Sequence, residues 1–225
     1  MIYLEAAAPQ EVQIDPREVL RYAGFGRNVP EPQMARMIES VTHEIAQAAV
    51  CRACFALCDI SVTEPLIDFG AFSVMSKALA KNLKGCRRAV LFGATIGAGA
   101  DRVIAKYNRL SPSAAVIAQA AGAAAIESWC DLFCGRLADR LAKDGCYLRP
   151  RFSPGYGDFA LECQRDVFRV LDCPRQIGLA LTDSCMMTPS KSVSAVMGLS
   201  RENTRCDKSG CESCGRRAVC EYARG

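Results

Sequence analysis

The stretch CRRAVLFGATI, residues 86–96, carries the strongest β-strand signal in the sequence. Its apolar run is nearly continuous, and Gly85 and Gly97 bound it. A run of this composition is typical of a strand whose two faces are both covered. We therefore expect residues 86–96 to form a buried strand.

Helical patterns lie on both sides of this strand. An apolar stripe at helical spacing runs through residues 33–50. Asp15 and Ser111 each precede a proline and are expected to act as N-caps. The predicted helices cover residues 16–25, 33–50, 73–83, 98–108, 113–143 and 159–172.

Further strands are expected at residues 54–63 and 65–69, and residues 178–189 and 192–200 are expected to pair with each other. Helices clustered between strands that need hairpin-like connections predict an α+β fold. We expect a mostly antiparallel, twisted sheet with packed helices over residues 1–200.

Length and charge exclude several classes of protein. A chain of 225 residues can bury about 70% of its unfolded surface without a metal or disulfide. The 28 basic and 24 acidic residues include no run of five like charges, so nucleic acid is not an expected partner. The longest apolar run, residues 114–126, is too short to span a bilayer, and residues 1–15 lack a signal-peptide pattern. We expect a cytoplasmic protein without membrane contacts.

The 14 cysteines are expected to be free thiols, because the reducing cytosol does not support a disulfide framework. His43 is the single histidine, so triads and metal sites built on histidine are excluded. Its polar surroundings predict a position on the surface of a helix.

The stretch RFSPGYGD, residues 151–158, has the composition of a ligand-binding loop. Its Pro-Gly turn and paired glycines let the backbone approach a ligand closely. Arg151 suits bidentate pairing with a carboxylate, and the Tyr156 ring can cover an apolar or cationic group. The alternative is a plain strand-to-helix connection, with Asp158 near the start of the helix.

RFSPGYGD resembles the Arg-x-x-Pro-Gly-Tyr signature of the activation (reactivation) domain of cobalamin-dependent methionine synthase, in a short stand-alone form. Three further segments, AVLFGATIGAGADRVI, AAAIESWCDLFCGRLADRL and LTDSCMMTPSKSVSAVMGLS, are similar to that family in the same order. The resemblance covers roughly residues 87–200 and implies the fold of that domain.

The resemblance implies an S-adenosylmethionine site at Glu127, Arg151, Ser153, Pro154, Gly155 and Tyr156. Arg151 suits the ligand carboxylate, and Glu127 suits a cationic or hydroxyl group of the ligand. Backbone groups of residues 153–155 suit the polar edge of adenine, and Tyr156 suits the wall beside the methyl group. The alternative for Glu127 is a solvent-facing carboxylate, although its place after an apolar run favours partial burial against Arg151 or a ligand amine.

The implied activity is reductive methylation of cob(II)alamin to methylcobalamin on a partner, which is the cobalamin-binding module of a methionine synthase or another corrinoid protein. An electron donor is also implied. No catalytic residue is expected, because positioning is the main task of the protein when the methyl group is already activated on sulfur. The alternative function is a metal-binding or iron–sulfur redox or scaffold protein that docks on a corrinoid protein without methyl transfer.

Residues 201–225 form a short cysteine-rich tail in which Cys206, Cys211, Cys214 and Cys220 have the spacing of a metal-binding knuckle. An all-thiolate set suits either zinc or an iron–sulfur cluster, and an unliganded tail is the alternative. Upstream, the strand pattern places Cys54 and Cys58 on one face and Cys51 on the other, which opposes a shared metal. The remaining cysteines are expected to be small buried apolar residues: Cys86, Cys130, Cys134, Cys146, Cys163, Cys173 and Cys185.

Overall fold

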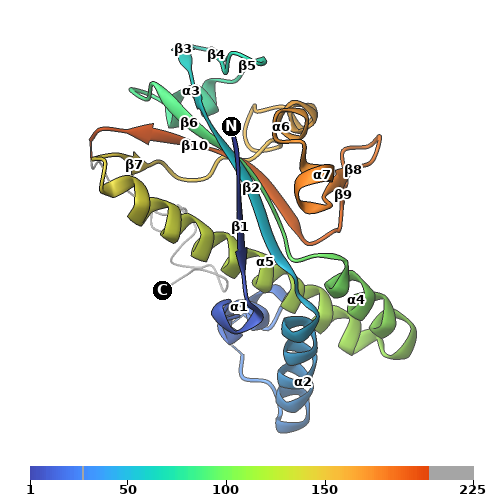
Figure 1. Cartoon of the computed structure of the whole chain (residues 1–225). Helices are drawn as coiled ribbons and strands as arrows, with labels where there is room; N and C mark the ends of the chain where they lie inside the picture. The colour runs from blue at the N-terminus through green and yellow to red at the C-terminus, as the bar shows by residue number, and fades with distance from the viewer. Residues whose placement is uncertain (27, 203–225) are drawn as a thin grey trace.

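The computed structural model describes residues 1–26 and 28–202, and its centre is a five-stranded antiparallel sheet (Figure 1). The strand order is β1-β2-β6-β10-β7, so the apolar run seen in the sequence lies in the middle as β6. The strands are β1 (Ile2–Ala7), β2 (Cys51–Asp59), β6 (Arg88–Thr95), β7 (Tyr147–Leu148) and β10 (Ser192–Ser200).

Four helices cover one face of this sheet. Val90, Phe92 and Ala94 of β6 point into their cluster, because alternate residues of a strand face the same side. The Phe133 ring lies at its centre, 5.2 Å from the ring of Phe92 and 5.5 Å from that of Phe55. The helices are α1 (Pro16–Tyr22), α2 (Pro32–Ala48), α4 (Ala98–Leu110) and α5 (Pro112–Ala142).

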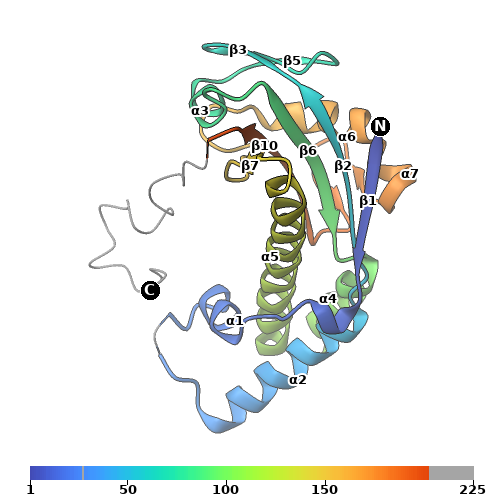
Figure 2. The same ribbon diagram turned by 60° about the vertical axis from the view of Figure 1, so that its left-hand side comes forward.

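A second hydrophobic cluster covers the opposite face, where Ala89 and Leu91 of β6 point. Figure 2 shows α5 on one side of the sheet and α6 and α7 on the other. The elements around this cluster are α3 (Lys77–Asn82), α6 (Gln164–Leu171) and α7 (Cys173–Ile177), and a small sheet of β3 (Ser61–Thr63), β4 (Leu66–Asp68) and β5 (Ser73–Met75). A separate hairpin joins β8 (Ala180–Leu181) to β9 (Met187–Thr188), and short 3-10 turns cover Pro9–Glu11 and Leu161–Cys163.

The predicted α+β class and antiparallel sheet are confirmed, and the predicted caps hold. The Asp15 carboxylate accepts a hydrogen bond from the Arg17 amide, and the Ser111 hydroxyl accepts one from the Ala114 amide. Pro16 and Pro112 occupy the first helical positions behind them. None of the described helices has the length and apolar composition needed to cross a membrane.

Three element predictions are wrong. Residues 54–63 do not form one strand, because β2 ends at Asp59 in the main sheet and residues 61–63 form β3 of the small sheet. Residues 73–83 form strand β5 followed by α3, because Val74 pairs with Ile67 of β4 and Ser76 then caps the helix. Residues 178–189 do not pair with residues 192–200. They fold back on themselves as β8 and β9, and β10 pairs with β6 and β7 instead.

The cysteines of β2 lie as the strand pattern predicts. Cys51 belongs to the cluster on the α5 face, and Cys54 and Cys58 face the opposite cluster. All described cysteines are free thiols. Cys134 and Cys163 were expected to be buried but are partly exposed. Cys58 is partly exposed as well. His43 is exposed on α2, as predicted. The tail cysteines Cys206, Cys211, Cys214 and Cys220 lie outside the described residues, so the division at residue 200 stays a prediction.

Candidate functional site

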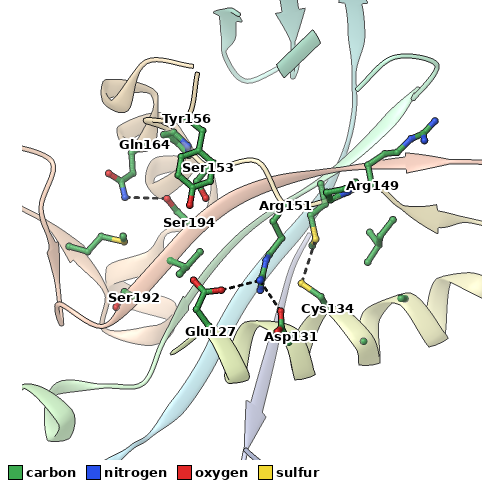
Figure 3. A pocket seen from close by; sticks show the side chains of 18 of the residues that line it. Glu127, Asp131, Cys134, Arg149, Arg151, Ser153, Tyr156, Gln164, Ser192 and Ser194 are labelled. Atoms are coloured by element: carbon green, nitrogen blue, oxygen red, sulfur yellow. Dashed lines mark hydrogen bonds and ion pairs between the residues drawn. The ribbon is translucent and has the colours of Figure 1, made fainter. Parts of the chain in front are cut away.

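A cavity with a volume of about 1850 Å³ opens beside α5, at the edge of the main sheet (Figure 3). One wall is α5, with Glu127, Asp131 and Cys134. The segment after β7, the start of α6, the β8–β9 hairpin and β10 form the other walls. The cavity therefore brings together segments that lie far apart in the sequence.

The backbone register points Arg151 into this cavity. Residues 147–152 run antiparallel to β10: Leu148 pairs with Leu199, and Phe152 forms a bridge with Val196. The Phe152 side chain packs with the cluster on the α6 face. Because neighbouring side chains of an extended chain point to opposite sides, Arg151 faces α5.

The chain then folds into a tight turn. The Gly155 amide donates to the Phe159 carbonyl over 2.7 Å, and the Tyr156 amide donates to the Ser153 carbonyl over 3.1 Å. Gly155 has φ +94°, a conformation that a side chain disfavours. Phe159 is buried and fixes the end of the turn, whereas Tyr156 is 61% exposed at the cavity.

Asp158 ties this turn to a distant helix. Its carboxylate accepts hydrogen bonds from the Ser76 hydroxyl (2.6 Å) and from the amides of Lys77 (2.8 Å) and Ala78 (3.0 Å) at the start of α3. These bonds, with that from Ser76 the largest cause, lower the pKa of Asp158 to about 2. The alternative from sequence placed Asp158 near the start of the next helix, but it caps α3 instead.

Asp158→Asn should lower the melting temperature at neutral pH, because the ionised carboxylate is the form that accepts all three bonds. The pKa of Asp158 is lowered from 3.8 to about 2, so its stabilising contribution is present above about pH 4 and is lost as the pH falls towards 2. Melting curves of both proteins across this range should therefore converge at acid pH. Asp59→Asn, at a side chain 95% exposed, should change little, and a difference that persists at low pH would contradict the role of the charge.

Arg151 forms a three-membered charge cluster with α5. Its Nη2 lies 3.1 Å from Glu127 Oε2 and 2.8 Å from Asp131 Oδ1. The two carboxylates are one helical turn apart, so they project from the same side of α5. Nη1 is buried and has no hydrogen-bond partner among the residues that the structure describes. A buried guanidinium nitrogen in this state calls for a ligand or water.

The Cys134 thiol near the charge cluster is not an activated nucleophile. Burial raises the pKa of the Cys134 thiol to about 11, so this thiol is protonated at neutral pH. Its Sγ lies 3.6 Å from Met197 Sδ of β10, on the cavity wall. Within residues 1–26 and 28–202, no group of three or more His, Cys, Asp or Glu side chains has the arrangement to hold a metal ion.

Gln164 of α6 supplies a second polar point in the cavity. It is only 3% exposed, and its Nε2 donates to the Ser194 hydroxyl over 3.2 Å (Figure 3). Its Oε1 is buried without a hydrogen-bond partner in the described part of the chain. One end of this amide is thus unpaired among the described residues that line the cavity.

The structure brings most of the predicted site residues together. Glu127, Arg151, Ser153, Pro154 and Tyr156 line the cavity, and Gly155 shapes the turn between them. Glu127 is 38% exposed and pairs with Arg151, which is the partner that the sequence suggested. Asp131 and Gln164 were missed. The spacing of Asp131 from Glu127 was a usable signal, whereas nothing near Gln164 in sequence marks it.

The fold indicates which class of domain this chain resembles. The chain is similar in structure to a solved protein described as the crystal structure of the MetH reactivation domain bound to AdoHcy, with a TM-score of 0.64. The match covers 91% of this chain and 80% of that chain at 12% identity, a level at which the likeness shows the fold. The chain therefore has the fold of a methionine synthase reactivation domain.

Part of the sequence also matches this family. Residues 138–224 match the family model described as vitamin B12 dependent methionine synthase, activation domain. The resemblance stated from the RFSPGYGD signature is thus confirmed, since that signature lies inside the matched range. No curated protein matches the chain.

Proposed function

We propose that this chain binds S-adenosylmethionine in the cavity beside α5 and activates a cobalamin-dependent methionine synthase or another corrinoid protein. The observation that carries the proposal is the Arg151 guanidinium, whose buried Nη1 has no partner in the described chain. This guanidinium lies in a cavity of a reactivation-domain fold, and the similar solved domain is described as bound to AdoHcy.

Each site residue has a role that its geometry supports. Arg151 would pair with the methionyl carboxylate, and Glu127 would accept from the ligand ammonium or a hydroxyl. The Ser153 carbonyl already accepts from Tyr156 but has a second lone pair for the adenine edge. The exposed Tyr156 ring would lie beside the methyl group.

The size of the cavity supports the binding of a partner protein in addition to the ligand. Pockets for small molecules usually measure about 300–1,000 Å³, whereas this cavity measures about 1850 Å³. A nucleoside-sized ligand would fill only part of it. The remaining open part would receive the cobalamin face of the partner.

The chemistry needs no acid, base or nucleophile from this chain. An external one-electron donor would supply the reduction of cob(II)alamin on the partner, and S-adenosylmethionine held in this cavity would supply the methyl group and leave as S-adenosylhomocysteine. The task left to the cavity residues would be to orient the ligand.

The ligand part of the proposal is tested by equilibrium dialysis of the full chain with labelled S-adenosylmethionine. We expect saturable binding that unlabelled S-adenosylhomocysteine displaces. Absence of saturable binding would remove the ligand from the proposal, whatever the behaviour of a partner.

The partner part is tested anaerobically with a corrinoid protein, a reductant and S-adenosylmethionine. We expect the absorption spectrum of methylcobalamin to develop only when the full chain is present. Equal rates with and without the chain would leave a scaffold or redox role as the better function.

The tail remains a separate prediction, because Cys206, Cys211, Cys214 and Cys220 lie outside the described residues. Anaerobic purification should give a brown protein if the tail binds an iron–sulfur cluster and a colourless, zinc-containing protein if it binds zinc. The ten described cysteines are free thiols, which suits the cytoplasmic location that we propose.

A further inference from the structure

The two terminal nitrogens of Arg151 are used unequally. Nη2 contacts two carboxylates, Glu127 at 3.1 Å and Asp131 at 2.8 Å, whereas Nη1 contacts neither within hydrogen-bonding distance. Nη1 is also buried, so a ligand in the cavity must first meet the guanidinium at another nitrogen. Nη2 is the nitrogen that faces the two carboxylates on the cavity wall.

A ligand carboxylate binds a guanidinium best through two parallel hydrogen bonds. With end-on geometry, one oxygen takes a hydrogen of Nη2 and the other takes a hydrogen of Nη1. The Nη2 hydrogens already serve Glu127 and Asp131. One of these two carboxylates must therefore leave before a ligand carboxylate can use both nitrogens.

Exposure indicates which carboxylate leaves. The Asp131 side chain is 70% exposed, whereas that of Glu127 is 38% exposed. An exposed ion pair contributes little stability, and a released Asp131 is well solvated. Glu127 can keep its bond to Nη2 and hold the guanidinium in place.

We propose that Asp131 is an exchangeable counter-ion that occupies Arg151 in the empty cavity and yields to the carboxylate of the ligand. Asp131 is then a positioning residue: it orients Arg151 before binding and competes with the ligand for one donor. The exchange gives Nη1 its missing partner. This inference rests on the proposed S-adenosylmethionine site and deepens it.

The test is ligand binding to the full-length Asp131→Ala chain. The dissociation constants of S-adenosylmethionine and S-adenosylhomocysteine should fall on the order of threefold, which is the competition expected from an exposed ion pair. Decarboxylated S-adenosylmethionine lacks the competing group, so its dissociation constant should not fall. A purely structural role of Asp131 would not distinguish ligands by their carboxylate.

Asp139→Ala is the matched control, because Asp139 is also exposed on α5 and lines the same cavity. It lies about 12 Å further along the helix, beyond the screening length of about 10 Å at 0.1 M salt. This variant should bind all three ligands as the wild type does. Thermal unfolding of both variants checks that the helix is intact.

Unchanged or weaker binding of the carboxylate ligands to Asp131→Ala would overturn the exchange while leaving the proposed site intact. An equal gain for the decarboxylated ligand would also overturn it, since the effect would then be general electrostatics. Failure of the wild type to bind any of the ligands would refute the proposed function and the exchange together.

Discussion

Arg151→Ala should weaken S-adenosylmethionine binding by about a hundredfold, with little change for a ligand that lacks the carboxylate. Hydrogen bonds to charged groups contribute about 1.5–3 kcal/mol, and about 2.7 kcal/mol corresponds to two orders of magnitude in affinity. The loss also leaves Glu127 and Asp131 without their shared cation, which adds repulsion in an already acidic wall. Titration calorimetry of the full chain measures the change.

The Arg151→Lys variant separates the contribution of the positive charge to ligand binding from that of the planar guanidinium. Lysine keeps the positive charge but has no planar fork, so we expect binding between that of the wild type and Arg151→Ala. Arg169→Ala is a surface control, since that side chain is 67% exposed and pairs with Asp166 on α6. Unchanged affinity in Arg151→Ala would show that the ligand binds elsewhere, and a melting curve excludes unfolding as the cause of a loss.

Gly99→Ala should be the most destabilising small substitution in the scaffold. A Cβ atom at this position in the first turn of α4 would lie 2.0 Å from the carbonyl oxygen of Ala48, where α2 ends. Backbone cannot yield as a flexible side chain does, so we expect about 3 kcal/mol of destabilisation. For a chain of this length, the melting temperature should fall by roughly 6–12 °C.

Gly135→Ala is the matched control for the same chemical change. A Cβ atom there meets nothing within 4 Å, and Gly135 lies inside the helix α5. Alanine is favoured over glycine in a helix by up to about 1 kcal/mol, so this variant should be at least as stable as the wild type. Equal melting temperatures for Gly99→Ala and the wild type would mean that α4 does not pack on the end of α2 as described.

Local sequence predicts those elements whose signals are local. The apolar run of β6 and the capped start of α5 at Ser111 and Pro112 are present in a few consecutive residues, and both elements form where expected. The partner of a strand is not local information. β10 pairs with β6, about a hundred residues away, and no pattern in residues 178–200 separates this from a hairpin.

The same distinction applies to β1 and β5. β1 pairs with β2 and has Leu4 exposed, so its alternation is weak and it was not predicted. Val74 of β5 is buried through its pairing with β4, a tertiary effect that overrides the helical propensity of residues 73–83. Ser76, which caps α3, was the one local sign that the helix starts later.

For the site, the family signature identified Arg151 and Tyr156, and the contact of Arg151 with α5 follows from the fold rather than from spacing. Asp131 could have been found from its position one turn after Glu127. Gln164 could not, because its meeting with Ser194 depends on how α6 lies against β10.

Along α5, Glu127 and Asp131 alternate with Trp129 and Phe133, which are fully buried in the interior. One wall of the cavity is therefore continuous with the hydrophobic cluster on the α5 face and cannot move outward without disrupting that packing. Relatives that accept a bulkier donor or a different corrinoid should thus vary in the 153–157 turn and the β8–β9 hairpin, and keep this helix unchanged.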